Sequence, residues 1–392
     1  MITLCVLLSL GLVLAAVSLL GFATLSKDRW QFLAAVPVRP DAVAGRWQSV
    51  NLTWYGVLIG ASMVLSLAVY LFLLASVRVP VGVSAWTAAL MLAVCVPASF
   101  GVARLVEQRR NVASMGGASF VGFLLAPWVV LGVGALWRRW TGSPIPPDAV
   151  LAALAVAYAI GEGTGRLACL SFGCCYGRPL AECPQGVQRM FARWHVAFHA
   201  ATHKAVYDSG LAAQPLVPIQ GVTTIVLSGL ALLGIGLFLN GHFLWTLALV
   251  TGGSQLWRFG SEFLRADIRG RHRSLSAYQV MSLVGALGYV GFGLLFAGGD
   301  GVRPDPLLGL RSLWSPGVIL LLQAAGVVAF LRYGISTVTA SSVEFRVIPE
   351  AVAVSRDTRR PDGQETGAGF FLPSCDAEAD RLPPAARAIP CL

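Results

Sequence analysis

Ionisable and thiol side chains gather where one apolar run ends, in the segment 165–177. The segment places Arg166 beside three thiols, those of Cys169, Cys174 and Cys175. A charged side chain near membrane depth is costly, and such groups mark functional sites by default. We therefore expect this segment to form part of a binding or catalytic site.

A second charged group closes another apolar run. Arg258, Glu262 and Arg265 are spaced at i, i+4 and i+7, which predicts that they share one helical face. Glu162 stands four residues before Arg166, and the same spacing links these two as an ion pair. Each arginine, taken singly, is also explained as a helix-end anchor that reaches the headgroups. Two apolar runs that both end in arginine nevertheless favour a site for an anionic lipid headgroup, because guanidinium groups bind phosphate bidentately.

The composition is that of an integral membrane protein. The 392 residues are 56% hydrophobic and 12% charged, whereas a soluble domain carries about 25% charged residues. The runs lack the alternation of a β-barrel, so the sequence predicts an all-α polytopic membrane protein. Nine runs are close to the ~20 residues that a spanning helix needs: 2–25, 54–77, 82–103, 118–137, 149–170, 216–239, 242–264, 276–298 and 315–335.

These runs divide the chain into a seven-helix core with one extra transmembrane helix at each end. The first run is expected to be a retained helix rather than a signal peptide, because no Lys or Arg precedes it. The polar, proline-rich tail is expected to be largely disordered beyond Pro349. The predicted units are an N-terminal helix at 1–25, a polar segment at 26–53, the core at 54–298 with an extramembrane cap at 171–215, a C-terminal helix at 315–335 and the tail at 336–392.

Thiols and imidazoles in and beside the cap raise the question of a metal site. Zinc sites favour cysteine pairs two to four residues apart, and the spacing here does not match. The three histidines fall at i, i+4 and i+8, which predicts a histidine face on a cap helix. We expect packing thiols and a polar helix, with no metal and no cofactor, and a metal site remains the alternative. The residues in question are Cys169, Cys174, Cys175, Cys183, His195, His199 and His203.

Four segments resemble motifs of the prolipoprotein diacylglyceryl transferase family of bacterial inner membranes, in the family's order. The segment 52–56 resembles its Trp-Tyr-Gly motif, and 116–122 resembles its Gly-Gly-x-Ser-Phe-His-Gly loop. The segment 165–177 resembles its signature beginning Gly-Arg-x-Gly-Asn-Phe, and 258–265 resembles its Arg-Phe-x-x-Glu-Phe-x-Arg segment. The resemblance covers roughly residues 52–285.

The chain also departs from these motifs. Val121 stands where the family motif has a histidine that helps proton transfer, Cys169 replaces the signature asparagine, and Cys174 replaces its glutamate. The stretch 217–223 resembles the family's His-Pro-x-Gln-Leu-Tyr-Glu but lacks its His, Tyr and Glu. The residues expected to bind the lipid phosphate are therefore retained. The motif residues that would help to deprotonate the acceptor thiol are replaced.

The resemblance implies transfer of a diacylglyceryl group from phosphatidylglycerol to the cysteine thiol of a prolipoprotein signal peptide. It implies a multi-pass protein of the bacterial inner membrane with the lipid bilayer as its surroundings and no nucleic acid partner. The expected catalytic residues are Arg166 and Arg258, which would hold the phosphate, and Glu262, which would fix Arg258. The expected substrate-binding residues are Tyr55, Gly117, Ser119, Gly122, Cys169, Cys174 and Arg265.

Orientation and function each leave an alternative open. The positive-inside rule puts the arginine-rich face, which includes the cap, in the cytoplasm, whereas the resemblance puts it at the periplasmic leaflet, and we expect the latter. The functional alternative is a divergent paralogue that binds anionic phospholipid or transfers its group to another acceptor. A solute transporter is disfavoured, because the runs hold few midspan charges and no paired broken helices.

Overall fold

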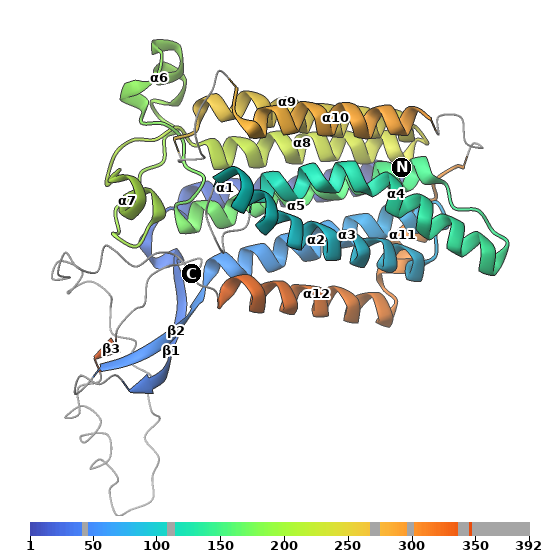
Figure 1. Ribbon diagram of the computed structural model, residues 1–392, viewed down its shortest axis with the longest axis horizontal. Helices are drawn as coiled ribbons and strands as arrows, with labels where there is room; N and C mark the ends of the chain where they lie inside the picture. The colour runs from blue at the N-terminus through green and yellow to red at the C-terminus, as the bar shows by residue number, and fades with distance from the viewer. Residues whose placement is uncertain (41–45, 108–113, 267–274, 296–301, 336–344, 347–392) are drawn as a thin grey trace, which may run out of the picture.

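The described part of the chain is a bundle of long helices with a small sheet and a cap at one end (Figure 1). We analysed a computed structural model, which describes residues 1–40, 46–107, 114–266, 275–295, 302–335 and 345–346. The helices run side by side along the long axis of the molecule, so most connections are turns at its two ends.

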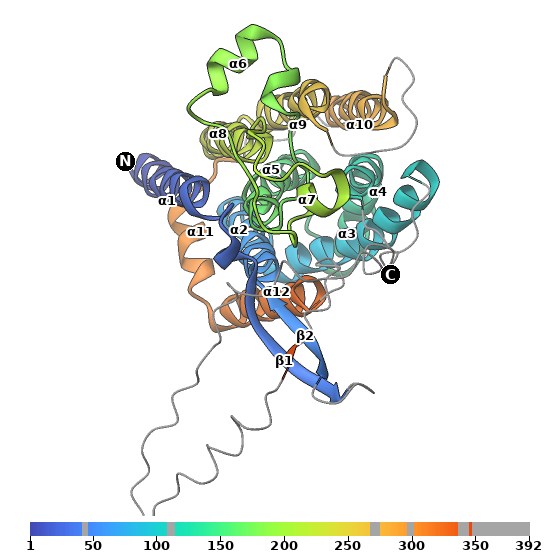
Figure 2. The ribbon, with the colours of Figure 1, turned by 90° about the vertical axis from the view of Figure 1, so that its left-hand side faces the viewer.

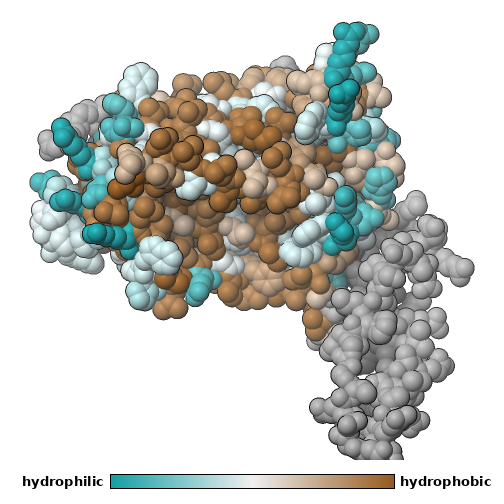
Figure 3. Space-filling model, turned by 180° about the vertical axis from the view of Figure 1, so that it is seen from behind, coloured by the Kyte–Doolittle hydropathy of each residue, from teal (hydrophilic) through white to brown (hydrophobic). Residues whose placement is uncertain are grey.

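Eight helices in these ranges are long and apolar enough to cross a membrane, and the chain is therefore a multi-pass membrane protein. Figure 3 shows a broad apolar band across one face of the bundle, with polar side chains towards both ends. The eight are α1 (Ile2–Thr24), α2 (Trp54–Ser76), α3 (Val81–Val102), α4 (Met115–Thr141), α5 (Pro147–Phe172), α8 (Ile219–Leu239), α10 (Ala277–Leu294) and α12 (Pro316–Gly334).

The ninth predicted run forms α9 (Phe243–Ser261), which lies beside α8 and α10 but is not among these eight candidates. Its buried face carries polar side chains, among them Thr246, Ser254 and Gln255. The predicted all-α membrane architecture thus holds for the bundle, whereas a seven-helix core with one added helix at each end is not confirmed.

The two terminal helices pack into the bundle. A Cβ atom on Gly221 of α8 would lie 1.5 Å from the ring of Phe22 in α1. A Cβ atom on Gly56 of α2 would lie 2.1 Å from the Cα of Gly334 in α12, and Thr53 Oγ1 donates a hydrogen bond to the Gly334 carbonyl at 3.2 Å. Small residues let helix backbones approach closely in lipid, so α12 is closely joined to the start of α2.

Helix α5 is the centre of the bundle (Figure 2). Of its most apolar window 78% is buried, against 11% for α1 and for α3. Ser62 and Ser66 of α2 donate hydrogen bonds to carbonyls of Gly161 and Ala157 in α5, at 2.8 and 2.7 Å. Polar side chains that reach this helix therefore lie away from lipid, which lets α5 carry charged groups.

Two features outside the long helices were not predicted. The polar segment 26–53 contains a short helix, η1 (Asp28–Trp30), and an antiparallel hairpin of β1 (Phe32–Pro40) and β2 (Arg46–Thr53), with Val36 opposite Val50. The strand β3 (Phe345–Arg346) pairs with β2. A short helix, α11 (Pro306–Leu313), begins at the capping carboxylate of Asp305 and packs on α2. The rest of the predicted tail lies outside the described residues.

The cap segment, residues 171–215, lies beyond one end of the bundle and contains η3 (Leu180–Glu182), α6 (Gln185–Phe191) and α7 (Lys204–Ser209). The prediction of one helix carrying the three histidines is wrong. Val196 and Phe198 are extended, since they bridge to Leu216 and Ala212, and both side chains are buried. Burying alternate residues requires an extended chain, which overrides the four-residue spacing of the histidines.

Candidate functional site

One carboxylate holds two arginines at the end of the bundle nearest the cap. Glu162 and Arg166 stand one turn apart on α5, and their ion pair confirms the predicted i, i+4 contact. Arg258, near the end of α9, places its Nη1 atom 3.0 Å from the same Glu162 oxygen. The Glu162 side chain is 2% exposed, and the side chains of Arg166 and Arg258 are 10% and 12% exposed. The three side chains form a buried ion cluster, which we call the Arg-Glu-Arg cluster.

Further polar groups on α5 and α9 fix Arg258. Tyr158, one turn before Glu162, accepts a hydrogen bond from Arg258 at 3.4 Å and another from Gln255 at 3.2 Å. Gly116, at the start of α4, leaves no room for a side chain, since a Cβ atom there would lie 2.9 Å from an Arg258 nitrogen. The guanidinium group is therefore held by contacts from three helices.

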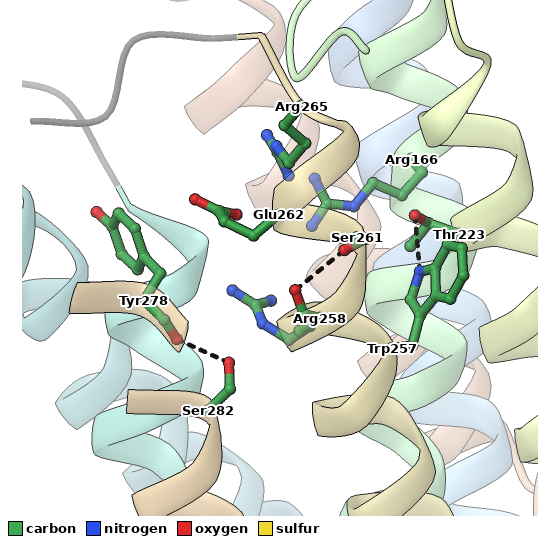
Figure 4. A pocket seen from close by; sticks show the side chains of 9 residues that line it. All are labelled: Arg166, Thr223, Trp257, Arg258, Ser261, Glu262, Arg265, Tyr278 and Ser282. Atoms are coloured by element: carbon green, nitrogen blue, oxygen red, sulfur yellow. Dashed lines mark hydrogen bonds between the residues drawn. The ribbon is translucent and has the colours of Figure 1, made fainter. Parts of the chain in front are cut away.

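A cavity opens beside this cluster (Figure 4). The empty space there is about 340 Å³, a volume that includes open solvent at its mouth. Trp257 donates a hydrogen bond to Thr223 at 3.0 Å and closes one wall, while Tyr278, hydrogen-bonded to Ser114 at 2.7 Å, forms the opposite one. The lining residues are Arg166, Thr223, Trp257, Arg258, Ser261, Glu262, Arg265, Tyr278 and Ser282.

The backbone joins the two charged segments recognised in the sequence. Helix α9 ends at Ser261, and η4 (Glu262–Leu264) leads to Arg265, whose backbone is extended. The predicted helix to residue 264 is therefore wrong, and Arg258, Glu262 and Arg265 do not share one helical face. Arg265 instead forms an antiparallel bridge with Gly177. Arg178 N–H donates to the Leu264 carbonyl at 2.9 Å. This pairing keeps the Arg265 side chain at the cavity that Arg166 and Arg258 also line.

The structure brings together four of the predicted site residues and leaves others elsewhere. Arg166, Arg258, Glu262 and Arg265 line the cavity, while the specific role of Glu262 in fixing Arg258 stays a prediction. Tyr55, in the first turn of α2, packs edge-on against Phe172 at a centroid distance of 5.8 Å.

The three predicted substrate-binding residues on α4 are Gly117, Ser119 and Gly122. The two glycines lie against α3, and Ser119 hydrogen-bonds to the backbone of its own helix. A Cβ atom on Gly117 would meet Val102, and one on Gly122 would lie 3.1 Å from the Cys95 sulfur. Ser119 donates hydrogen bonds to carbonyls of its own helix at 3.0 and 3.1 Å. These three are not among the residues that line the cavity, and their role in binding substrate stays a prediction.

Cys169 and Cys174 lie together with Cys175, also outside the cavity lining. Hydrogen bonds with Cys169 and Cys174, together with the nearby charges of Arg265 and Arg166, hold the pKa of the Cys175 thiol well below its usual range. Hydrogen bonds with the other two thiols, and burial, raise the pKa of Cys174 well above that range. The loop after α5 thus favours a single thiolate, on Cys175.

The chain matches no protein-family model, no curated protein and no solved structure. The functional assignment therefore depends on this geometry and on the four motif segments.

Sequence reasoning missed the central position of Glu162, which was linked only to Arg166. Its contact with Arg258 spans 96 residues of sequence, so no local spacing reveals it. Tyr158 carried a usable signal, because Tyr158, Glu162 and Arg166 repeat every four residues and so share one face of α5. Tyr278 carried no comparable signal.

The arrangement is suited to holding a singly charged anion. Two buried guanidinium groups share one carboxylate, and the further lining charges, those of Arg265 and Glu262, are opposite in sign. Among these described side chains the positive charges outnumber the negative ones by one, before the Cys175 thiol close to Arg166 and Arg265 is counted. An uncompensated buried charge is costly, so binding an anion there is favourable.

Proposed function

We propose that this protein transfers a diacylglyceryl group from phosphatidylglycerol to the cysteine thiol of a lipoprotein signal peptide in a bacterial inner membrane. The observation that carries the proposal is the Arg-Glu-Arg cluster beside an open cavity at the end of the bundle. Its two arginines come from two of the four segments that resemble the transferase motifs, 165–177 and 258–265. The phosphodiester of phosphatidylglycerol carries one negative charge, which equals the excess positive charge of the site.

In the proposed reaction the acceptor thiolate attacks the glyceryl carbon that carries the phosphate. A carbon–sulfur bond forms, the carbon–oxygen bond to phosphate breaks, and glycerol phosphate leaves with the electron pair. Arg166 and Arg258 neutralise the charge that builds on the departing phosphate, and Arg265 adds a third cation at the same cavity. Donors held in place before reaction stabilise such charge without reorganisation, and removing one commonly costs 10²–10³ in rate.

The acceptor thiol must lose its proton, and Val121 cannot accept it. A free thiol has a pKa near 8.5, and adjacent cations lower it. The guanidinium groups that line the cavity favour the thiolate of a bound acceptor, with the proton passing to solvent at the open side. The signal-peptide cysteine therefore needs no dedicated histidine.

The absence of that histidine also favours the second candidate, a paralogue that binds anionic phospholipid or modifies another acceptor. The stretch 217–223 supports it, because it lacks the family's His, Tyr and Glu. In the structure Gln220 of this stretch donates a hydrogen bond to the Cys174 carbonyl at 2.9 Å, which positions the cysteine loop.

The test uses the full chain in vesicles that contain phosphatidylglycerol, with a synthetic signal peptide as acceptor. We expect the peptide to gain a diacylglyceryl group while glycerol phosphate is released. Arg166→Ala should lower the rate by about 10²-fold or more, and Arg139→Ala, an exposed arginine at the end of α4 far from the cavity, should not. A fully active Arg166→Ala protein would contradict the phosphate assignment.

Two further outcomes separate the candidates. Rescue of a strain depleted of its own transferase supports the enzyme. Unchanged phosphatidylglycerol content, together with lipid binding that Arg166→Ala and Arg258→Ala both abolish, supports the lipid-binding paralogue.

A further inference from the structure

Three thiols converge where α5 ends. The Sγ atoms of Cys169, Cys174 and Cys175 all lie within 4.8 Å of one another. Cys169 is buried, and the other two are partly exposed. Cysteines with this spacing in sequence, five and then one residue apart, have no reason to meet unless the backbone turns sharply between them.

The backbone makes that turn in two steps. Gly173 adopts a left-handed conformation (φ 71°) and closes the helix, with its N–H donating to the Cys169 carbonyl at 2.9 Å. The N–H of Cys174 donates to the same carbonyl at 3.1 Å, which folds Cys174 back over Cys169. Cys175 is itself left-handed (φ 54°), a conformation that costs energy for a residue with a side chain. Strain of this kind is typical of sites where the position of one side chain matters.

The surroundings stabilise negative charge on one of the three sulfur atoms, that of Cys175. Arg166 stands one turn before Cys169 on α5, and both Arg166 and Arg265 act electrostatically on Cys175. The segment is held from the other side by Gln220, whose amide binds the Cys174 carbonyl. Three thiolates crowded together would repel one another, and the two guanidinium groups offset only part of that repulsion.

We propose that Cys169, Cys174 and Cys175 form a three-thiolate site for a soft, thiophilic cation of the zinc or copper(I) class. Soft thiolate ligands select such ions over magnesium or calcium. With metal–sulfur bonds of about 2.3 Å, three sulfurs around one ion lie about 4 Å apart, so the observed separations need to contract by less than about 1 Å. Three thiolates and Zn²⁺ carry one net negative charge, which the nearby charges of Arg166 and Arg265 favour.

This site is separate from the anion cavity, whose lining includes none of the three cysteines, and it does not depend on the proposed transferase activity. A site with three ligands, one from the end of α5 and two from the loop after it, leaves a coordination position open, as in catalytic rather than structural zinc sites. The three cysteines lack the two-to-four-residue spacing that zinc sites favour. The left-handed backbone at Gly173 and Cys175 brings their sulfur atoms together instead.

The test measures metal binding by the full-length protein, reduced and purified in detergent. Zn²⁺ and Cu⁺ are titrated against a competing chelator, and Cd²⁺ serves as a spectroscopic probe because thiolate-to-cadmium charge transfer absorbs in the ultraviolet. We expect one equivalent of metal and a charge-transfer band. Each single change among Cys169→Ser, Cys174→Ser and Cys175→Ser should weaken binding at least tenfold. Cys183→Ser, a buried cysteine outside the cluster, should bind as the unchanged protein does.

A second measurement needs no variant and so does not depend on whether the variants fold. Zn²⁺ should slow alkylation of Cys175 in the unchanged protein, as read by peptide mass spectrometry, and leave Cys183 unaffected. The proposal is overturned if the reduced protein shows neither binding nor protection, or if the band persists when all three cysteines are serine. A disulfide within the cluster that forms in air, with no metal bound after reduction, would show a redox pair in place of a metal site.

Discussion

Removing the charge of Glu162 should destabilise the protein far more than any exposed carboxylate does. Glu162→Gln keeps the size of the side chain but leaves Arg166 and Arg258 facing each other without their shared counter-charge. The two arginine side chains are only 10% and 12% exposed, so the little water that reaches them only partly replaces the lost carboxylate.

The expected loss follows from this burial. Breaking a buried ion pair by removing one partner costs about 3–5 kcal/mol, which is two to nearly four powers of ten in the folding equilibrium. The assay is unfolding in mixed micelles with increasing denaturing detergent, followed by circular dichroism. Glu182→Gln, an exposed carboxylate in the cap segment, is the matched control and should change stability by no more than about 0.5 kcal/mol.

A double variant distinguishes a charge effect from a packing effect. Glu162→Gln combined with Arg258→Met removes one charge of each sign and restores the original excess of one positive charge. It should be more stable than Glu162→Gln alone, because the remaining guanidinium group no longer faces a second one. If Glu162→Gln behaves like the Glu182→Gln control, or if the two changes simply add, the account of the Arg-Glu-Arg cluster is incorrect.

Three further results are expected. Burial lowers the pKa of His203 from 6.5 to about 4, so the neutral ring favours the folded cap. The free energy of unfolding should therefore fall by up to about 3 kcal/mol as the pH drops from about 6.5 towards 4. His203→Gln should flatten this pH profile in thermal melts. Iodoacetamide should label Cys175 at about pH 6, where most thiols are unreactive, and should spare Cys174, as peptide mass spectrometry will show; equal labelling would refute the pKa order. Gly56→Ala should lower the melting temperature in detergent, since overpacking costs about 1–3 kcal/mol, whereas Gly132→Ala, whose new Cβ would meet nothing within 4 Å, should not.

Local spacing predicted what lies on one helix and missed what joins two. Arg166 and Glu162 are four residues apart, and helical geometry alone brings them together. Arg258 reaches the same carboxylate through the packing of α9 against α5, which depends on buried polar and small residues along both helices. The apolar runs located the helices for a similar reason, since twenty apolar residues can satisfy their backbone in lipid only by forming a helix.

The errors arose where burial competes with periodicity. The histidine spacing in the cap segment indicated a helix, but Phe198 and Val196 bury alternate side chains and the chain is extended there. The hairpin of β1 and β2 went unpredicted because residues 32–40 do not alternate between apolar and polar types, the usual sign of a half-buried strand. The convergence of the three thiols was not predicted, because sequence spacing does not reveal a left-handed backbone at position 175.

The contact between Thr53 and Gly334 joins residues 281 positions apart. This separation determines how long α2 waits in the membrane before α12 is synthesised. At about 5–20 residues per second, α12 leaves the ribosome roughly 14–56 s after the start of α2. Throughout that interval the glycines of α2 that α12 will cover face acyl chains or another nascent helix. Ribosome stalling before residue 315 should therefore trap an intermediate in which the face of α2 that α12 covers is still exposed. A lipid or an insertion factor that covers this face would act as a chaperone for the last step of assembly.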